Sequence, residues 1–207
     1  MSVTAAQGFR AAGVAAGLKS TGAADVAVVV NDGPTQSAAA VFTSNRCKAN
    51  PVLWSEQAIT GGTAKAVAIN SGGANCYTGA EGFATTHRTA ELVAERLGVG
   101  AVEVQVCSTG LIGLLNDRDD LLAGVGSAID ALADDAGSAA ARAIMTTDSV
   151  PKEAVSAGDG FTVGGMAKGA GMLAPALATM LVVVTTDADV DPATADAALR
   201  TATARTF

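Results

Sequence analysis

The sequence predicts an α/β (α+β) fold in which short apolar strands alternate with longer amphipathic helices. Five segments are short, apolar and rich in β-branched residues, as buried strands are: residues 26–30, 38–43, 65–70, 102–107 and 179–185. Between them, two longer segments have their apolar side chains at helical spacing. A buried core is expected, since 49% of the 207 residues are hydrophobic and only 16% are charged.

The two helices are predicted over residues 81–97 and 119–133, and both are expected to pack on a sheet. Their apolar faces consist of Phe83, Ala90, Val93 and Leu97 in the first helix, and Leu121, Leu122, Val125, Ile129 and Leu132 in the second. Near the end of the chain, Asp191 and Pro192 have the form of an N-cap and a first helical position. They predict a helix still running at Phe207, which indicates an N-terminal fragment of a longer protein.

Charge and hydropathy exclude several classes of partner. The net charge of -7 opposes a large phosphate-binding surface, so no nucleic acid is expected as a partner. The N-terminus has no continuous apolar stretch, and the longest purely apolar runs, such as 180–184, are too short to span a bilayer. We therefore expect no membrane partner and a cytoplasmic location.

Cysteine and histidine usage argues against metal sites. Cys47, Cys76 and Cys107 are odd in number and about thirty residues apart, which fits neither a disulfide framework nor paired metal ligands. The single histidine, His87, falls inside an expected helix. A histidine-based catalytic triad or a multi-histidine metal site would depend on this residue alone, so no metal is predicted.

Two glycine motifs suggest cofactor binding but lack the necessary context. Gly169, Gly171 and Ala174 match the dinucleotide fingerprint GxGxxA, but a proline and a β-rich run follow where a helix should open. A loose RxxGxA match, starting at Arg10, is expected by chance in a chain rich in Gly and Ala, and lies too early for an acetyl-CoA-binding fold. No cofactor is predicted.

Three polar or glycine-rich segments remain between the apolar ones: NSGGAN at 70–75, CSTGLIG at 107–113 and GGMAKGAGMLAPALATML at 164–181. The last is interpreted as a loop that enters a strand, with glycines that allow the backbone to approach a ligand. Within it, the hydroxyl of Thr179 follows the small residue Ala178, an arrangement that an intramolecular acyl shift needs. From spacing alone, Thr179 is more simply the first residue of a buried strand.

Together these segments closely resemble the ornithine acetyltransferases of arginine biosynthesis, the ArgJ family of bifunctional glutamate N-acetyltransferases. AIMTTDSVPK at 143–152 resembles the substrate loop of that family, and TSNRCKANPVLW at 43–54 also matches it. The resemblance runs from about residue 8 to residue 207, and only LLNDRDD at 114–120 is less typical. It implies a DmpA/ArgJ-like fold and an autoprocessing enzyme of the N-terminal-nucleophile type.

The resemblance implies that Thr179 is both the nucleophile and a substrate-binding residue. The scissile bond matches Ala178–Thr179, which would divide the chain into an α-chain segment, 1–178, and the start of a β-chain, 179–207. The free α-amine of the new N-terminal threonine would take the proton from its own Oγ, so no histidine base is required. The family's missing second half would complete the site.

Other site residues follow from the same resemblance. Thr109 and Gly110 match the oxyanion-hole donors, while Thr146 and Lys168 match residues that contact the substrate. Thr147 is the alternative if the register is shifted by one residue, and Asp148 is left without a role.

The implied reaction transfers acetyl from N-acetyl-L-ornithine to L-glutamate through an acetyl-threonine intermediate. Acetyl-CoA is a further possible substrate, since some members use it, and a family-like assembly would contain two α and two β chains. Two alternatives stay open: an N-terminal-nucleophile aminopeptidase or amidase that passes the acyl group to water, and a non-catalytic binding module that remains uncut.

Overall fold

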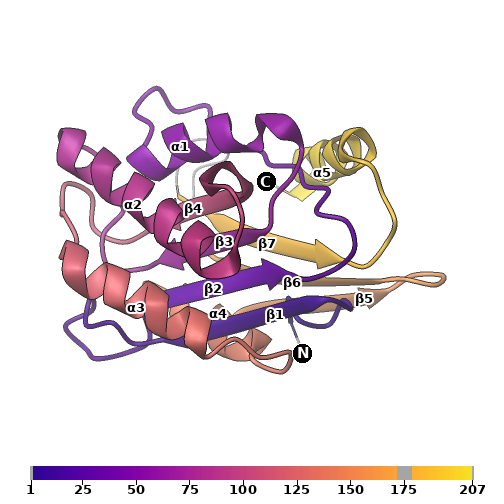
Figure 1. Cartoon of the computed structure of the whole chain (residues 1–207), viewed down its shortest axis with the longest axis horizontal. Helices are drawn as coiled ribbons and strands as arrows, with labels where there is room; N and C mark the ends of the chain where they lie inside the picture. Colours follow the sequence, from indigo (N-terminus) through magenta and orange to yellow (C-terminus); the bar gives the residue numbers. More distant parts are fainter. Residues whose placement is uncertain (1, 172–178, 207) are drawn as a thin grey trace.

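The computed structural model describes residues 2–171 and 179–206, which form two β-sheets with helices packed around them (Figure 1). The first sheet has the strand order β1-β2-β3-β4, and the second has the order β5-β6-β7. The strands of the first sheet are β1 (Phe9–Val14), β2 (Val26–Asn31), β3 (Ala66–Asn70) and β4 (Val104–Ser108). Neighbouring strands are antiparallel except β3 and β4, which are parallel. A parallel pair needs a crossover connection, and α2 (Gly79–Leu97) provides it.

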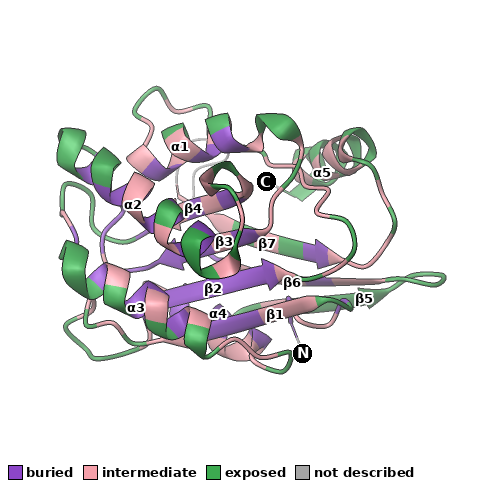
Figure 2. Ribbon diagram, in the orientation of Figure 1, coloured by how far each residue is buried: buried purple, intermediate pink, exposed green. Residues whose placement is uncertain are grey.

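Both faces of the first sheet are covered. On one face, Val26, Val28 and Val30 of β2 pack with residues of α2 and α3 (Arg118–Asp130). On the other face, Ala27 and Val29 pack with α4 (Gly137–Ala143) and with the second sheet. This explains the continuous apolar run of β2, which Figure 2 shows buried along most of its length.

Helix α1 (Asn50–Ala58) closes the free edge of β4. The Ser55 hydroxyl donates to the Val106 carbonyl oxygen at 2.9 Å and accepts from the Val106 N–H at 3.0 Å. The Trp54 indole N–H donates to the Val104 carbonyl oxygen at 3.0 Å. These side chains satisfy backbone groups that an uncovered edge strand would leave unpaired. Short 3-10 helices, η1 (Ile59–Gly61) and η2 (Ala101–Glu103), precede β3 and β4.

The second sheet is antiparallel and contains β5 (Lys152–Ala157), β6 (Thr162–Lys168) and β7 (Leu181–Thr186). Its inner face packs against the first sheet and the N-terminal segment: Met166 is buried, and the Thr185 hydroxyl donates to the Val3 carbonyl oxygen at 2.7 Å. On its outer face, Val182 and Val184 are exposed.

The structure confirms most of the predicted elements. The predicted helices correspond to α2, α3 and α5 (Pro192–Thr206), and the Asp191 carboxylate accepts the Thr194 N–H at 2.8 Å as the predicted N-cap. Four of the five predicted strands correspond to β2, β3, β4 and β7, with β4 starting two residues later because η2 occupies 101–103. No described helix is long and apolar enough to cross a membrane.

Two sequence predictions are wrong. Residues 38–43 form no strand: both edges of β2 are taken by β1 and β3, and the 38–43 segment is held instead by the Ala38 N–H, which donates to the Gly62 carbonyl oxygen at 2.8 Å. Residues 164–168 are strand β6 rather than a loop. At Gly164 a Cβ would lie 2.2 Å from the Ser2 carbonyl oxygen, so this glycine allows close strand packing rather than ligand approach.

Candidate active site

The predicted oxyanion segment begins where β4 ends. The Thr109 N–H donates to the Asn70 carbonyl oxygen at 2.9 Å, and the Thr109 side chain is buried. Gly110 follows with φ +124°, and a Cβ at this position would lie 2.2 Å from the Gly72 carbonyl oxygen. Only glycine fits this conformation and this space, so the backbone direction at Gly110 is fixed by packing against the 70–75 loop.

Side-chain amides hold the 70–75 loop against the oxyanion segment. The Asn70 amide donates to the Gly73 carbonyl oxygen at 3.0 Å, and its own oxygen accepts the Ser108 hydroxyl. The amide of Asn116 donates to the same Gly73 oxygen at 3.2 Å. The polar NSGGAN motif is therefore a buried support for the oxyanion segment.

The atypical 114–120 segment leaves this support intact. Besides Asn116, it contains Asp117, whose carboxylate accepts the backbone N–H groups of Asp119 and Asp120, each at 3.0 Å. Asp117 is thus the N-cap of α3. Residues 114–120 therefore connect the oxyanion segment to the start of α3 in a defined conformation.

Lys168, at the end of β6, connects the two sheets at the site. Its ammonium donates to the Thr109 hydroxyl oxygen at 3.0 Å, although the two residues are 59 positions apart. The Lys168 side chain is buried, and burial lowers the pKa of its ammonium, whereas the Asp148 carboxylate raises that pKa and the Lys152 charge lowers it. Because the Thr109 oxygen accepts from a cation, its own hydroxyl proton remains available for donation to an oxyanion.

Asp148 ties the 146–148 loop to the end of β6. Its carboxylate accepts the Gly169 N–H at 2.8 Å and the Thr146 N–H at 3.2 Å, and it forms an ion pair with Lys152. Burial raises the pKa of Asp148, but the hydrogen bonds from Lys152, Gly169 and Thr146 outweigh burial and hold the pKa at about 2. Sequence analysis assigned no role to Asp148, and its position next to two threonines in the predicted substrate loop was the available signal.

Thr179 is half-buried and lies two residues before β7, which begins at Leu181. In the antiparallel register of β6 and β7, Lys168 is opposite Leu181, so Thr179 lies at the same end of the sheet as Lys168. Ala178, the predicted residue before the scissile bond, lies outside the described residues. Thr146 is half-buried and Thr147 is exposed.

His87 and the cysteines have no place in this site. The His87 ring packs between Trp54 and Phe83, with ring centroids 4.3 and 4.7 Å away. The three cysteines are free thiols, and Cys47 is exposed. In the described part of the chain, no group of three or more His, Cys, Asp or Glu residues is suited to hold a metal ion.

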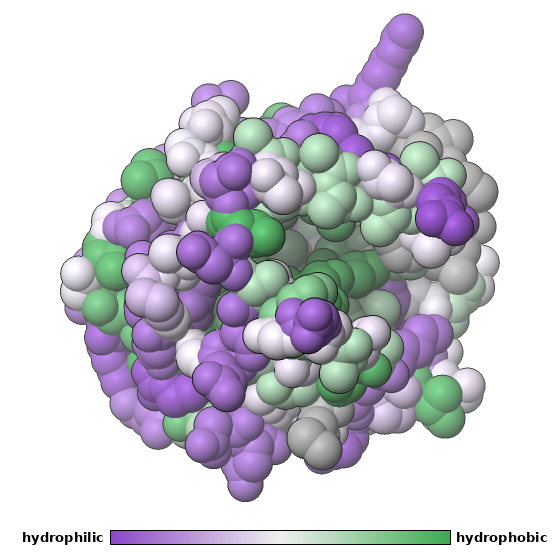
Figure 3. Space-filling view, turned by 90° about the vertical axis from the view of Figure 1, so that its right-hand side faces the viewer, coloured by the Kyte–Doolittle hydropathy of each residue, from purple (hydrophilic) through white to green (hydrophobic). Residues whose placement is uncertain are grey.

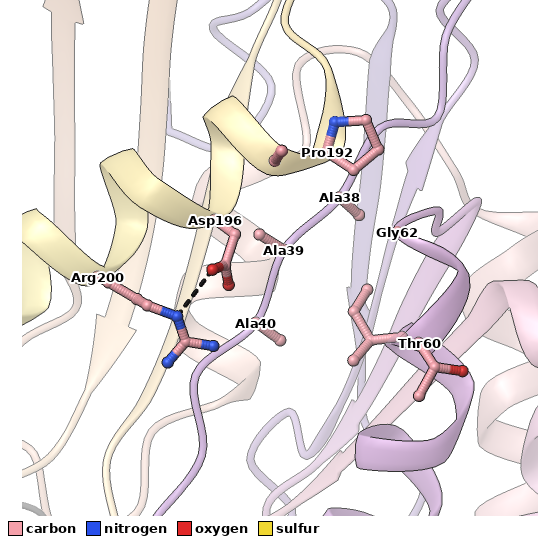
Figure 4. A pocket seen from close by; sticks show the side chains of 10 residues that line it. Ala38, Ala39, Ala40, Thr60, Gly62, Pro192, Asp196 and Arg200 are labelled. Atoms are coloured by element: carbon pink, nitrogen blue, oxygen red, sulfur yellow. Dashed lines mark hydrogen bonds and ion pairs between the residues drawn. The ribbon is translucent and has the colours of Figure 1, made fainter.

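Two hollows lie away from this cluster. One, of about 280 Å³, lies between residues 38–40 and the first half of α5, where alanine side chains line it beside the Asp196–Arg200 ion pair (Figure 4). The face of the molecule that carries α5 shows hydrophobic residues within a central hollow (Figure 3). The other hollow, of about 320 Å³, is lined by residues of strands β5, β6 and β7. Neither hollow is lined by a predicted catalytic residue. The candidate site is therefore defined by the hydrogen bonds around Lys168 and Asp148 and not by a cavity.

Comparisons with known proteins identify the family of the chain. The ArgJ family model matches residues 10–207. The chain belongs to the ArgJ family. It is 62% identical over 207 residues to the "Arginine biosynthesis bifunctional protein ArgJ" of Streptomyces coelicolor, covering 100% of this chain and 54% of that protein. It is 58% identical to the protein of the same name from Mycobacterium tuberculosis H37Rv, covering 53% of it. The chain thus spans about half the length of these relatives.

Two solved structures of the ArgJ family confirm the predicted mixed α/β, ArgJ-like fold. Ornithine acetyltransferase from Mycobacterium tuberculosis, solved in complex with ornithine, matches with a TM-score of 0.78 and 50% identity over 87% of this chain and 96% of that chain. The ArgJ protein of Bacillus halodurans matches with a TM-score of 0.69 and 27% identity, over 90% of this chain and 88% of that chain.

Proposed function

We propose that this chain is the first part of an acetyltransferase that moves acetyl from N-acetyl-L-ornithine to L-glutamate through acetyl-Thr179. The observation that carries the proposal is the hydrogen bond from Lys168 to Thr109, which joins the oxyanion segment to the strand end where Thr179 lies. Relatives named for arginine biosynthesis, and a related ornithine acetyltransferase bound to ornithine, support the choice of substrates.

The first step of the proposed mechanism is self-cleavage. The Thr179 Oγ attacks the Ala178 carbonyl carbon, the peptide C–N bond breaks, and the α-amine of Thr179 takes up a proton. Water then hydrolyses the resulting ester, which leaves the Ala178 carboxylate and regenerates the threonine hydroxyl. Cleavage would divide the protein into an α-chain ending at residue 178 and a β-chain beginning at residue 179.

The lengths of the relatives support this cleavage. The match to the crystallised Mycobacterium tuberculosis chain uses 87% of the present chain and covers 96% of the crystallised chain. The match to the full-length Mycobacterium tuberculosis relative covers only 53% of that relative. The crystallised chain is therefore about half as long as the full-length relative. Such a length is expected of one of two chains formed by cleavage.

Acetyl transfer follows at the new N-terminus. The α-amine of Thr179 takes the proton from Oγ, and Oγ attacks the acetyl carbonyl carbon of N-acetylornithine. The Thr109 hydroxyl and the Gly110 N–H donate to the oxyanion, a contribution of roughly 3 kcal/mol per donor. Ornithine leaves with the proton. The α-amine of glutamate then attacks the carbonyl carbon of the acetyl ester, the bond from that carbon to Oγ breaks, and a proton of the amine returns to Oγ, which releases N-acetylglutamate. Lys168 and Thr146 hold the amino-acid substrate.

Several finer features belong to the same proposal. The protein needs no cofactor, acts in the cytoplasm and assembles from two α and two β chains, and acetyl-CoA is an additional donor. The second half of the protein contributes the remaining substrate contacts, so residues 1–207 alone are expected to have little activity.

Intact mass of the full-length protein tests the nucleophile. We expect the wild type to appear as two pieces split between Ala178 and Thr179, and Thr179→Ala to stay whole. Thr201→Ala, on the exposed helix α5, is the matched control and should be cleaved normally. An uncut wild-type chain would remove the autoprocessing mechanism and favour a binding module.

A second assay tests the acceptor. The cleaved enzyme is incubated with N-acetylornithine with and without glutamate, and the products are separated. Acetylglutamate that forms only with glutamate supports the transferase. Release of acetate without acetylglutamate would instead support an N-terminal-nucleophile amidase.

A further inference from the structure

The five lysines of the chain divide into two groups. Three form ion pairs with a carboxylate: Lys48 with Glu56, Lys65 with Asp32, and Lys152 with Asp148. Within residues 2–171 and 179–206, the other two, Lys19 and Lys168, form no ion pair, and both are at least half-buried. Both ammonium groups without an ion pair lie at the candidate site: Lys168 donates to the Thr109 hydroxyl oxygen, and Lys19 donates to the carbonyl oxygen of Met145, next to Thr146.

Lys19 reaches the active site from the turn that precedes β2. Its ammonium donates to the Ala24 carbonyl oxygen at 2.8 Å and to the Met145 carbonyl oxygen at 2.7 Å. Met145 directly precedes Thr146, so the Lys19 charge lies beside the predicted substrate loop. An ammonium has three N–H donors, and no described residue accepts the third.

The Lys19 and Lys168 charges are close enough to repel each other. Burial lowers the pKa of Lys19 and the Asp25 carboxylate raises it, while the Lys168 charge lowers it and the Asp148 carboxylate raises it. Two like charges at a partly dehydrated site are costly unless an anion joins them.

The carboxylates nearby are already engaged. The Asp25 side chain accepts the backbone N–H of Ala16 at 2.6 Å and that of Lys19 at 3.0 Å. Asp148 accepts backbone N–H groups and pairs with Lys152, as described above. A bound anion is therefore the natural partner of Lys19 and Lys168.

We propose that Lys19 is a second substrate-binding cation, which together with Lys168 receives the α-carboxylate of the amino-acid substrate. The inference rests on the proposed function for the identity of the substrate. The α-carboxylate is the group shared by ornithine, acetylornithine and glutamate, so one carboxylate-binding site formed by the two lysines serves both halves of the reaction. A purely structural role, in which Lys19 only holds the Met145 carbonyl, is the alternative that a test must separate.

Binding of L-ornithine and of L-ornithinamide to the full-length, cleaved protein separates the two roles, because the amide lacks the carboxylate charge. Isothermal titration calorimetry is performed on the wild type, Lys19→Met and Lys19→Arg. Lys65→Met is the matched control, because Lys65 also donates to a backbone carbonyl, that of Asn31 at 2.7 Å, but lies at the opposite end of β3 from the 70–75 loop.

We expect Lys19→Met to weaken ornithine binding about 10- to 100-fold and ornithinamide binding less than about 3-fold, as loss of one charge-assisted hydrogen bond predicts. Lys19→Arg should restore part of the preference for ornithine, and Lys65→Met should leave it unchanged. Equal weakening of both ligands would show that Lys19 only holds the loop and would overturn the inference, as would unchanged binding of both or failure of the wild type to bind ornithine.

This test is independent of the acetyl-transfer reaction. Self-cleavage of each variant, measured by intact mass, reports that the site has folded. If ornithine binds as expected but no acetyl is transferred, the proposed reaction is wrong while the carboxylate-binding site is supported. If acetyl is transferred and Lys19→Met keeps the full preference for ornithine over ornithinamide, the role of Lys19 in carboxylate binding is wrong while the proposed reaction is supported.

Discussion

The two sheets contribute to the candidate site in different ways. The first sheet is covered on both faces, and its contribution, the oxyanion segment after β4, is held by backbone packing against the 70–75 loop. The second sheet packs on one face and contributes single side chains at the ends of β6 and β7, Lys168 and Thr179. Substitutions near the first sheet should therefore alter activity by displacing the oxyanion segment. Substitutions in the second sheet should either remove a single functional group or lower stability at the face that packs on the first sheet.

The largest effect is expected at the oxyanion segment. Gly110→Ala places a Cβ 2.2 Å from the Gly72 carbonyl oxygen, so the segment must shift and the donors lose their alignment. We expect kcat of the full-length enzyme to fall about 10²- to 10³-fold, as for the loss of one oxyanion donor.

Gly113→Ala is the matched control for this change. Gly113 also has a positive φ, +81°, but a Cβ there meets nothing within 4 Å. It should lose stability through backbone strain while kcat changes far less than in Gly110→Ala. Equal losses of kcat in both variants would mean that strain, and not the contact with the 70–75 loop, sets the oxyanion geometry.

An intermediate effect is expected within β6, where two adjacent glycines face opposite sides of the second sheet. A Cβ at Gly164 would lie 2.2 Å from the Ser2 carbonyl oxygen, whereas a Cβ at Gly165 would lie 3.6 Å from the Val183 carbonyl oxygen. We expect Gly164→Ala to reduce the free energy of unfolding by about 2–3 kcal/mol, as overpacking does, and Gly165→Ala to change it by less than about 0.5 kcal/mol.

Urea unfolding of the two full-length variants measures this difference. A loss at Gly165→Ala as large as that at Gly164→Ala would show that the outer face of the second sheet is also closely packed in the full-length protein. The contrast between the two sheets would then be wrong.

The same contrast explains which parts of the fold could be predicted. Strands β2 and β3 could be predicted because burial on both faces requires a continuous apolar run, and β4 could be predicted because its β-branched valines recur at every second position. Strands β1, β5 and β6 contain glycine, charged or hydroxyl residues, and only pairing with neighbouring strands makes them regular. The 38–43 segment has the right composition, but no strand edge is available to it beside β2.

The site shows a similar division. Thr109, Lys168 and Thr179 were predicted from the family resemblance, yet the contact between Thr109 and Lys168 spans 59 residues and has no local signal. Asp148 and Lys19 were missed because their importance depends on which backbone groups reach them in three dimensions.

The smallest effect concerns the pH dependence of stability at Asp148. Its pKa in the folded protein is about 2, below the ordinary value of 3.8, because of the hydrogen bonds from Lys152, Gly169 and Thr146, and its side chain is only 1% exposed. A carboxyl group with a lowered pKa stabilises the folded state above its unfolded pKa, and this contribution is lost as the pH falls through the folded pKa. We therefore expect Asp148 to contribute on the order of 1–2 kcal/mol above about pH 4, and this contribution to disappear between about pH 4 and pH 2.

Urea unfolding of the wild type and of Asp148→Asn between pH 6 and pH 2 measures this contribution. The wild type should be more stable at pH 6, and the two curves should converge toward pH 2, because protonation and the substitution both remove the charge. Asp159→Asn, an exposed acid in the turn between β5 and β6, is the control and should follow the wild type. Parallel curves with a constant separation would mean that Asp148 holds the loop through its shape and neutral hydrogen bonds. The link between the 146–148 loop and the end of β6 would then not depend on charge.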